Sequence, residues 1–178
     1  MKIYNLNTKS DFDQKNLCLT IGNFDGVHKG HQFVINKLIE VSNGSKLKSA
    51  LMTFTPHPKV FFGYTKGIFN ITTKKEKLSL LQEMGLDMYI DFDFDEELAN
   101  LSADAFIQKI MIEKLNVKKI VIGSDFRFGK DRKGNLKTLR LLSSKLDFDL
   151  VVTDILNIDE LDQKFSSSYI RKMIMGGK

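Results

Sequence analysis

Two histidines, His28 and His31, stand three residues apart in a glycine-rich stretch between an apolar run and an amphipathic one. The stretch, GNFDGVHKGH at residues 22–31, predicts a strand that leads through a phosphate-binding loop into a helix. N–H groups at the start of a helix and the positive end of its dipole attract an anion. Because residues three apart share a helix face, both imidazoles can face one bound phosphate. The predicted chemistry is stabilisation of charge that develops on a phosphoryl group.

Two further segments follow apolar runs and are rich in groups that could touch a ligand. One is TPHP at residues 55–58, where the only two prolines of the chain flank its third histidine, His57. The other, at 123–129, reads GSDFRFG. In a parallel sheet the carboxyl ends of the strands share one edge, so segments 22–31, 55–62 and 123–129 should converge on one crevice.

The segment SSSYIR at residues 166–171 predicts a second anion-binding helix start. A serine is a natural helix cap, but capping explains one serine and not three. Three hydroxyls beside Arg171 at a helix N-terminus suit the outer phosphates of a nucleotide.

Each of these residues also has an ordinary structural interpretation. A single histidine is by default structural, and imidazoles also bind zinc, although no cysteine cluster or HExxH helix supports zinc here. Asn23 and Asp25 are either turn formers or groups that position a substrate or Mg²⁺. Phe126 and Phe128 are either core residues on one face of a strand or ligand contacts. The two phenylalanines at 61–62 are either a lid over a flat ligand or ordinary packing.

The elements that must position these groups alternate along the chain. Apolar runs predict strands, and helical periodicity and caps predict the helices that follow them. Such alternation with short connections implies right-handed crossovers, and we therefore expect an α/β doubly wound parallel sheet of about five strands with helices on both faces. The expected strands are 17–21, 50–54, 87–92, 119–123 and 148–152, with a short edge strand at 3–6 as a further candidate, and the expected helices are 33–41, 73–84, 103–115, 136–144 and one from 166.

The composition suits a single domain. The 178 residues, 42% of them apolar, allow a full core, and no linker, repeat or low-complexity segment divides the chain. The net charge of +5 comes from scattered lysines, so an anionic small molecule fits better than nucleic acid. Cys18, the single cysteine, suits a core position in a reducing compartment. No stretch has the length of a membrane span and residues 1–5 show no leader, so we expect a cytoplasmic protein with no membrane partner.

Four motifs in this order resemble those of the FMN adenylyltransferase module of bacterial bifunctional riboflavin kinase/FAD synthetases, within the HxGH nucleotidylyltransferase superfamily. They are GNFDGVHKGH at 22–31, TFTPHP at 53–58, GSDFRFG at 123–129 and SSSYIR at 166–171. The resemblance covers almost the whole chain and implies a Rossmann-like fold. It implies transfer of AMP from ATP to FMN, with Mg²⁺, to give FAD and pyrophosphate. The FMN phosphate would attack the α-phosphorus in line without a covalent intermediate, so that the protein positions groups and neutralises charge.

The resemblance also implies roles for individual residues. The catalytic pair would be His28 and His31, which stabilise the transferring phosphate, and no side chain is assigned to hold a metal directly. ATP would contact Gly22, Phe24, Asp25, Gly30, Ser167, Ser168 and Arg171, and FMN would contact Asn23, His57, Phe62, Phe106, Asp125 and Phe128.

Two departures from the family pattern matter. The final motif usually reads Ser-Ser-Thr-x-Ile-Arg, and Ser168 replaces the threonine while keeping a hydroxyl. Family members usually continue into a riboflavin kinase β-barrel, so we expect one nucleotidylyltransferase domain at 1–178, without kinase activity. Two alternatives stay open: an HxGH adenylyltransferase with a different acceptor, such as a phosphopantetheine or nicotinamide nucleotide, and a non-catalytic flavin or nucleotide sensor. The presence of both histidines argues against a sensor, and the sequence leaves the oligomeric state open.

Overall fold

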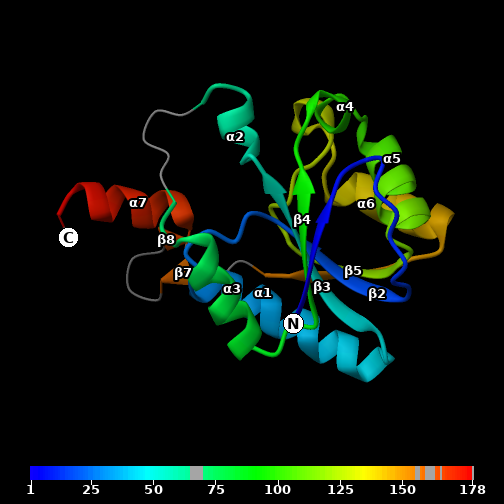
Figure 1. The fold of residues 1–178 in the computed structure, drawn as a ribbon, viewed down its shortest axis with the longest axis horizontal. Coiled ribbons are helices and arrows are strands. Elements are labelled where there is room, and N and C mark those ends of the chain that lie inside the picture. Colours follow the sequence, from blue (N-terminus) through cyan, green and yellow to red (C-terminus); the bar gives the residue numbers. More distant parts are fainter. Residues whose placement is uncertain (65–69, 155–156, 159–162, 165, 178) are drawn as a thin grey trace.

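The computed structural model describes residues 1–64, 70–154, 157–158, 163–164 and 166–177. Its central sheet has six parallel strands in the order β1-β4-β3-β2-β5-β6 (Figure 1). The strands are β1 (Lys2–Leu6), β2 (Leu17–Ile21), β3 (Lys48–Thr55), β4 (Met88–Asp93), β5 (Val117–Gly123) and β6 (Asp149–Thr153). A separate antiparallel pair consists of β7 (Asn157–Ile158) and β8 (Gln163–Lys164).

The expected parallel, doubly wound sheet is confirmed, but it has one strand more than the five expected. The added strand is β1, which confirms the short edge-strand candidate at 3–6 and pairs with β4 at the edge of the sheet. Lys2, Ile3 and Asn5 of this strand are exposed, whereas every residue of β2 is buried. An edge strand is covered less than a central one, so β1 lacks the continuous apolar run that reveals a central strand in the sequence.

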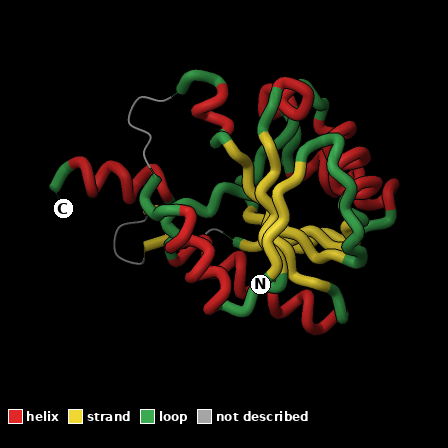
Figure 2. The backbone as a smooth tube through the Cα atoms, in the orientation of Figure 1, coloured by secondary structure: helices red, strands yellow, loops and turns green. Residues whose placement is uncertain are grey.

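Helices cover both faces of the sheet (Figure 2), and each face has its own core. Successive side chains of a strand point to opposite faces, so β2 sends Leu17, Leu19 and Ile21 into one cluster and Cys18 into the other. Cys18 is thus the core residue that its apolar neighbours predicted. Coverage on both sides explains why the central strands carry mainly apolar residues on both faces.

The long helices divide between these faces (Figure 1). α1 (Lys29–Ser45) and α3 (Lys74–Glu83) pack on the Cys18 side, and η1 (Phe106–Lys114) and α6 (Leu136–Leu146) pack on the other. The helix expected at 103–115 is present, but most of it is the π-helix η1. Within the described residues, no helix combines the length and apolarity needed to cross a bilayer. The shorter helices are α2 (Pro58–Phe61), α4 (Glu96–Ala99), α5 (Ala103–Ala105), η2 (Lys130–Arg132) and α7 (Ser167–Met175).

Polar caps begin the helices where the sequence predicts them. Thr73 and Glu76 form the expected capping box: Thr73 Oγ1 accepts from Glu76 N at 3.2 Å, and Glu76 Oε2 accepts from Thr73 N at 2.7 Å. Ser102 and Ser166 cap α5 and α7. Because a cap satisfies N–H groups within its own turn, these starts follow from local sequence alone.

On the two sides of the boundary between β2 and β5, the connecting helices lie on opposite faces of the sheet. From β2 the chain runs through α1 to β3 and through α3 to β4, then through α5 and η1 to β5 on the other side of β2. Sheets of this kind bind ligands beyond the carboxyl ends of the strands at such a switch point. Residues 22–31 and 123–129 follow β2 and β5, so the fold brings these two predicted segments together.

Candidate functional site

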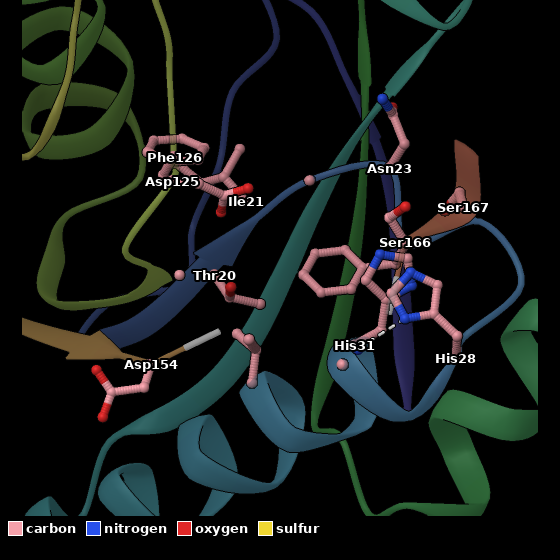
Figure 3. A pocket seen from close by; sticks show the side chains of 15 residues that line it. Thr20, Ile21, Asn23, His28, His31, Asp125, Phe126, Asp154, Ser166 and Ser167 are labelled. Atoms are coloured by element: carbon pink, nitrogen blue, oxygen red, sulfur yellow. Dashed lines mark hydrogen bonds between the residues drawn. The ribbon is translucent and has the colours of Figure 1, made fainter. Parts of the chain in front are cut away.

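A pocket opens at this switch point, beside the start of α1 (Figure 3). Its walls come from the segments after β2, β5 and β6 and from the start of α7. The predicted site residues that line it are Gly22, Asn23, Phe24, His28, Gly30, His31, Asp125 and Ser167. The lining residues to which the family resemblance assigned no contact are Thr20, Ile21, Val34, Gly123, Phe126, Asp154 and Ser166.

The two predicted catalytic histidines lie at the first turn of α1. His28 is the helix cap, and its Nδ1 accepts a hydrogen bond from His31 N at 3.3 Å. The imidazole rings stack with centroids 3.5 Å apart and an interplanar angle of 22°, and the Phe24 ring lies 5.0 Å from the His31 ring. Figure 3 shows the rings side by side in the pocket. Stacked in this way, next to the positive end of α1, the two rings can act on a single phosphoryl group.

Asp25 lies behind the pocket wall, where its residue is 7% exposed. Its carboxylate accepts from Ile71 N at 3.0 Å and Thr72 N at 3.2 Å, and it forms a buried ion pair with Arg171. Its main-chain oxygen accepts from Ser167 Oγ at 2.9 Å. Asp25 therefore ties the loop to the segment before α3 and to α7. Ser167 is held at the pocket by this tie, while Arg171 is buried against the carboxylate.

The other end of the pocket carries Thr20, Asp125, Phe126 and Asp154 (Figure 3). Thr20 and Asp154 each left a signal in the sequence: a hydroxyl inside an apolar run, and a carboxylate directly after a strand. The Phe126 ring stacks on Phe128 with centroids 5.5 Å apart. Two carboxylates accept hydrogen bonds and repel phosphate, so this end suits the uncharged part of a nucleotide.

A comparison with known protein families shows which family the chain belongs to. The chain matches the family model described as FAD synthetase over residues 10–169. It belongs to the FAD synthetase family. Relatives described as bifunctional riboflavin kinase/FMN adenylyltransferase include one from Escherichia coli K12, 35% identical over 97% of this chain and 53% of the relative, and one from Bacillus subtilis, 36% identical over 93% and 51%. The chain spans about half the length of the curated relatives it matches.

One solved structure shares the fold of this chain over nearly its whole length. It is described as a macrolide-efflux protein from Streptococcus pneumoniae, and it aligns with a TM-score of 0.83 and 27% sequence identity. The alignment covers 97% of this chain and 55% of the other. The doubly wound sheet is therefore common to both chains.

His57, which the FAD synthetase resemblance assigns to FMN, lies outside the pocket. It caps α2, and its Nδ1 accepts from Lys59 N at 3.0 Å. Burial lowers the pKa of His57, and the positive charges of Arg171 and Lys59 lower that pKa further. His57 thus lies within electrostatic reach of Arg171, but no residue of 55–62 lines the pocket. Of the three segments expected to share one crevice, two line this pocket and this one does not.

The three phenylalanines assigned to FMN occupy two different environments. Phe62 is 54% exposed, and its ring packs edge-on against Phe61 and Phe94 at centroid distances of 5.3 and 5.9 Å. Phe106 and Phe128 are 5% and 6% exposed, with their rings 6.0 Å apart inside the core. Phe62 is accessible to a ligand, whereas the other two lie behind the pocket-lining Phe126 ring or within the core.

The remaining predicted contact, Ser168, is exposed in the first turn of α7. Throughout the described parts of the chain, no group of three or more His, Cys, Asp or Glu side chains is placed to hold a metal ion. Asp125 and Asp154 nevertheless line the pocket. A divalent cation that arrives with a nucleotide would take most of its ligands from the phosphate chain and from water.

Proposed function

We propose that this chain is an FMN adenylyltransferase that transfers AMP from ATP to FMN and releases pyrophosphate. The observation that carries the proposal is the stacked His28 and His31 pair at the start of α1, in one pocket with Ser167 and Asp125, in a member of the FAD synthetase family. Family membership supports the reaction, and the pocket supplies groups suited to it.

ATP would lie along the pocket with its phosphates at the α1 end. His28, His31 and the first N–H groups of α1 provide donors there, and Ser167 provides a hydroxyl from α7. The adenosine part would lie toward Asp125 and Asp154, which carry no donor for phosphate. This orientation separates the charged and uncharged halves of the nucleotide.

The reaction needs positioning rather than a protein nucleophile. An oxygen of the FMN phosphate attacks the α-phosphorus of ATP, the bond from that phosphorus to the bridging oxygen breaks, and pyrophosphate leaves with the bonding electrons. Charge increases on the transferring phosphoryl group, where the two imidazoles stabilise it. Preorganised donors of this kind stabilise the transition state more than they stabilise the bound ground state.

FMN would approach from the side of α2. Asn23 lines the pocket, while His57 and the exposed Phe62 lie beyond it and offer a polar group and an aromatic ring for the flavin. Phe106 and Phe128 are buried, so their proposed part is to support Phe126 and the loop after β5.

For the outer phosphates we propose direct contacts from Ser167 and Ser168. Arg171 would act mainly by holding Asp25 and the start of α7 in place. Mg²⁺ brought in with ATP would take its ligands mainly from the phosphates and from water, because such a cation keeps several of its waters. Asp125 and Asp154, the carboxylates that line the pocket, lie at its adenosine end and not beside the phosphates, where Mg²⁺ would supply neutralisation of charge.

The test mixes purified residues 1–178 with ATP, Mg²⁺ and FMN and separates the products by chromatography. FAD and pyrophosphate are expected from FMN, and no FMN is expected from riboflavin, because the described pocket offers one nucleotide site. Parallel reactions contain a phosphopantetheine acceptor or a nicotinamide nucleotide. Product from one of those alone would assign another acceptor, and ATP or flavin binding without any product would favour a sensor.

A further inference from the structure

Lys77, on α3, contacts the phosphate loop, residues 22–31, without lining the pocket. Its Nζ donates a hydrogen bond to Asn23 O at 3.1 Å and lies 5.9 Å from the centre of the Tyr89 ring. Burial lowers the pKa of Lys77, and the nearby Asp25 and Asp91 carboxylates oppose that change. A half-buried ammonium group loses part of its hydration, which is unfavourable unless other contacts compensate. The hydrogen bond to Asn23 O is such a contact.

The carbonyl that Lys77 holds belongs to the peptide between Asn23 and Phe24. In a trans peptide the C=O and N–H groups point in opposite directions. Holding the carbonyl toward Lys77 therefore turns Phe24 N–H away from it. This N–H therefore lies on the side of the peptide away from Lys77, and Asn23 and Phe24 line the pocket whereas Lys77 does not.

The same peptide has a reason to rotate if it is not held. Phe24 has a φ of +48°, in the left-handed region that side chains with a Cβ avoid. Rotating the Asn23–Phe24 peptide by half a turn would return φ to a negative value and would direct the carbonyl to the pocket side. A carbonyl oxygen there would repel a phosphate. The Lys77 hydrogen bond opposes this rotation.

The segment just before and within α3 holds the loop at further points. Asp25 accepts from Ile71 N at 3.0 Å, and Gly26 N donates to Thr72 Oγ1 at 3.2 Å. These bonds fix the loop one and two residues beyond the strained peptide. Lys77 acts at the peptide itself, because its hydrogen bond is to the carbonyl that precedes Phe24.

We propose that Lys77 is a positioning residue that keeps Phe24 N–H directed at the phosphates of the bound nucleotide. The identity of that nucleotide as ATP rests on the proposed function. Lys77 touches neither ATP nor the reacting atoms, and it acts through the Asn23–Phe24 peptide.

The test compares Lys77→Met and Lys77→Arg with Lys75→Met, which removes an exposed lysine from the same helix. ATP and adenosine binding are measured by titration calorimetry, and thermal unfolding is followed in parallel. Lys77→Met is expected to weaken ATP binding about tenfold and to leave adenosine binding unchanged, because adenosine has no phosphate. Lys77→Arg, which retains a cationic donor, is expected to restore most of the ATP affinity, and Lys75→Met is expected to bind like the wild type.

Equal ATP affinity in folded Lys77→Met and wild type would overturn the proposal, as would equal losses for ATP and adenosine. If Lys77→Met does not fold, Lys77→Gln provides the same comparison with a polar side chain in the half-buried position. Calorimetry also separates this inference from the proposed function. A wild type that binds ATP but makes no FAD would contradict the adenylyltransferase assignment and still allow the Lys77 comparison.

Discussion

His28 and His57 have the same local role in two neighbouring regions, yet only His28 lines the pocket. His28 follows β2 and His57 follows β3, and each caps a helix through Nδ1, accepting from His31 N at 3.3 Å and from Lys59 N at 3.0 Å. The helices differ: α1 has 17 residues and packs on the sheet, whereas α2 has 4 residues and none of them is buried.

This difference shows that a histidine cap is not by itself a phosphate site. A long helix sums many peptide dipoles and offers several N–H groups to an anion, and a single turn offers little of either. The loop before α1 is also tied by Asp25 and Lys77 to α7 and α3. We therefore expect His28 to act in phosphoryl chemistry and His57 to act in acceptor binding.

The largest expected effect is on turnover at the α1 end. His28→Ala or His31→Ala should lower the rate of FAD formation about a hundredfold or more, with a much smaller loss of ATP affinity, because the imidazoles act on developing charge. Stopped reactions and calorimetry measure the two quantities. His28→Asn is the matched control, since asparagine keeps the cap and lacks the imidazole. Wild-type rates in both alanine variants would remove the catalytic assignment.

The next largest effect concerns the ion pair and hydrogen bonds that hold the loop after β2 in place. Asp25→Ala leaves Arg171 buried without its carboxylate and should lower the free energy of unfolding by about 3 kcal/mol. Lys37→Met, which breaks the exposed pair with Glu40 at 2.8 Å, should cost less than about 1 kcal/mol. Urea denaturation measures both. If the two variants lose similar stability, Asp25 does not hold the loop in the way described.

A related variant tests what the buried guanidinium of Arg171 contributes to ligand binding. Arg171→Lys keeps the charge but loses the planar fork that meets a carboxylate. We expect weaker ATP binding, because Ser167 is positioned through Asp25, and little change in FMN affinity. The opposite pattern in titrations with the two ligands would place Arg171 on the FMN side.

A smaller effect is expected in the region of α2. His57→Ala should raise the KM for FMN about fivefold and leave the KM for ATP near its wild-type value, because one hydrogen-bonding group on the acceptor side is lost. His57→Asn retains a capping side chain and separates this loss from fraying of α2. A fall in kcat as large as that of His28→Ala would mean that the two regions share the same chemistry after all.

The smallest effect is the pH dependence of stability from His57. Its pKa in the folded chain lies below the ordinary value of 6.5, so the unfolded chain binds more protons just below pH 6.5. Stability contributed by the neutral imidazole is therefore present above pH 6.5 and is lost as pH falls through the folded-state pKa. Thermal unfolding from about pH 7.5 to about pH 5 should show a smaller decline for His57→Gln than for the wild type. Identical declines would contradict the role given to burial and to Arg171.

The elements around the site could be predicted because their signals are local. The capping box of Thr73 and Glu76 closes within one helical turn, and the apolar run of β2 reports a strand covered on both faces. Alternation of strands and helices then restricts the topology to right-handed parallel crossovers. The convergence of 22–31 and 123–129 follows from that topology.

Other features of the site depend on contacts between distant parts of the chain. Asp25 and Arg171 are 146 residues apart, and in the folded chain they pair with each other and do not line the pocket. Asp154 reaches the pocket because β6 lies beside β5, and the burial of Phe106 against Phe128 depends on how η1 packs on the sheet.

The sequence by itself determined the doubly wound architecture, the His28 and His31 turn and the helix that follows it, because each depends on residues a few positions apart. Only the tertiary structure decided which loops share the pocket, that His57 lies outside it, and that Lys77 holds the Asn23 carbonyl. The physical reason is that a side chain's partners at long range are set by the packing of whole elements, and residue type restricts those partners without selecting among them.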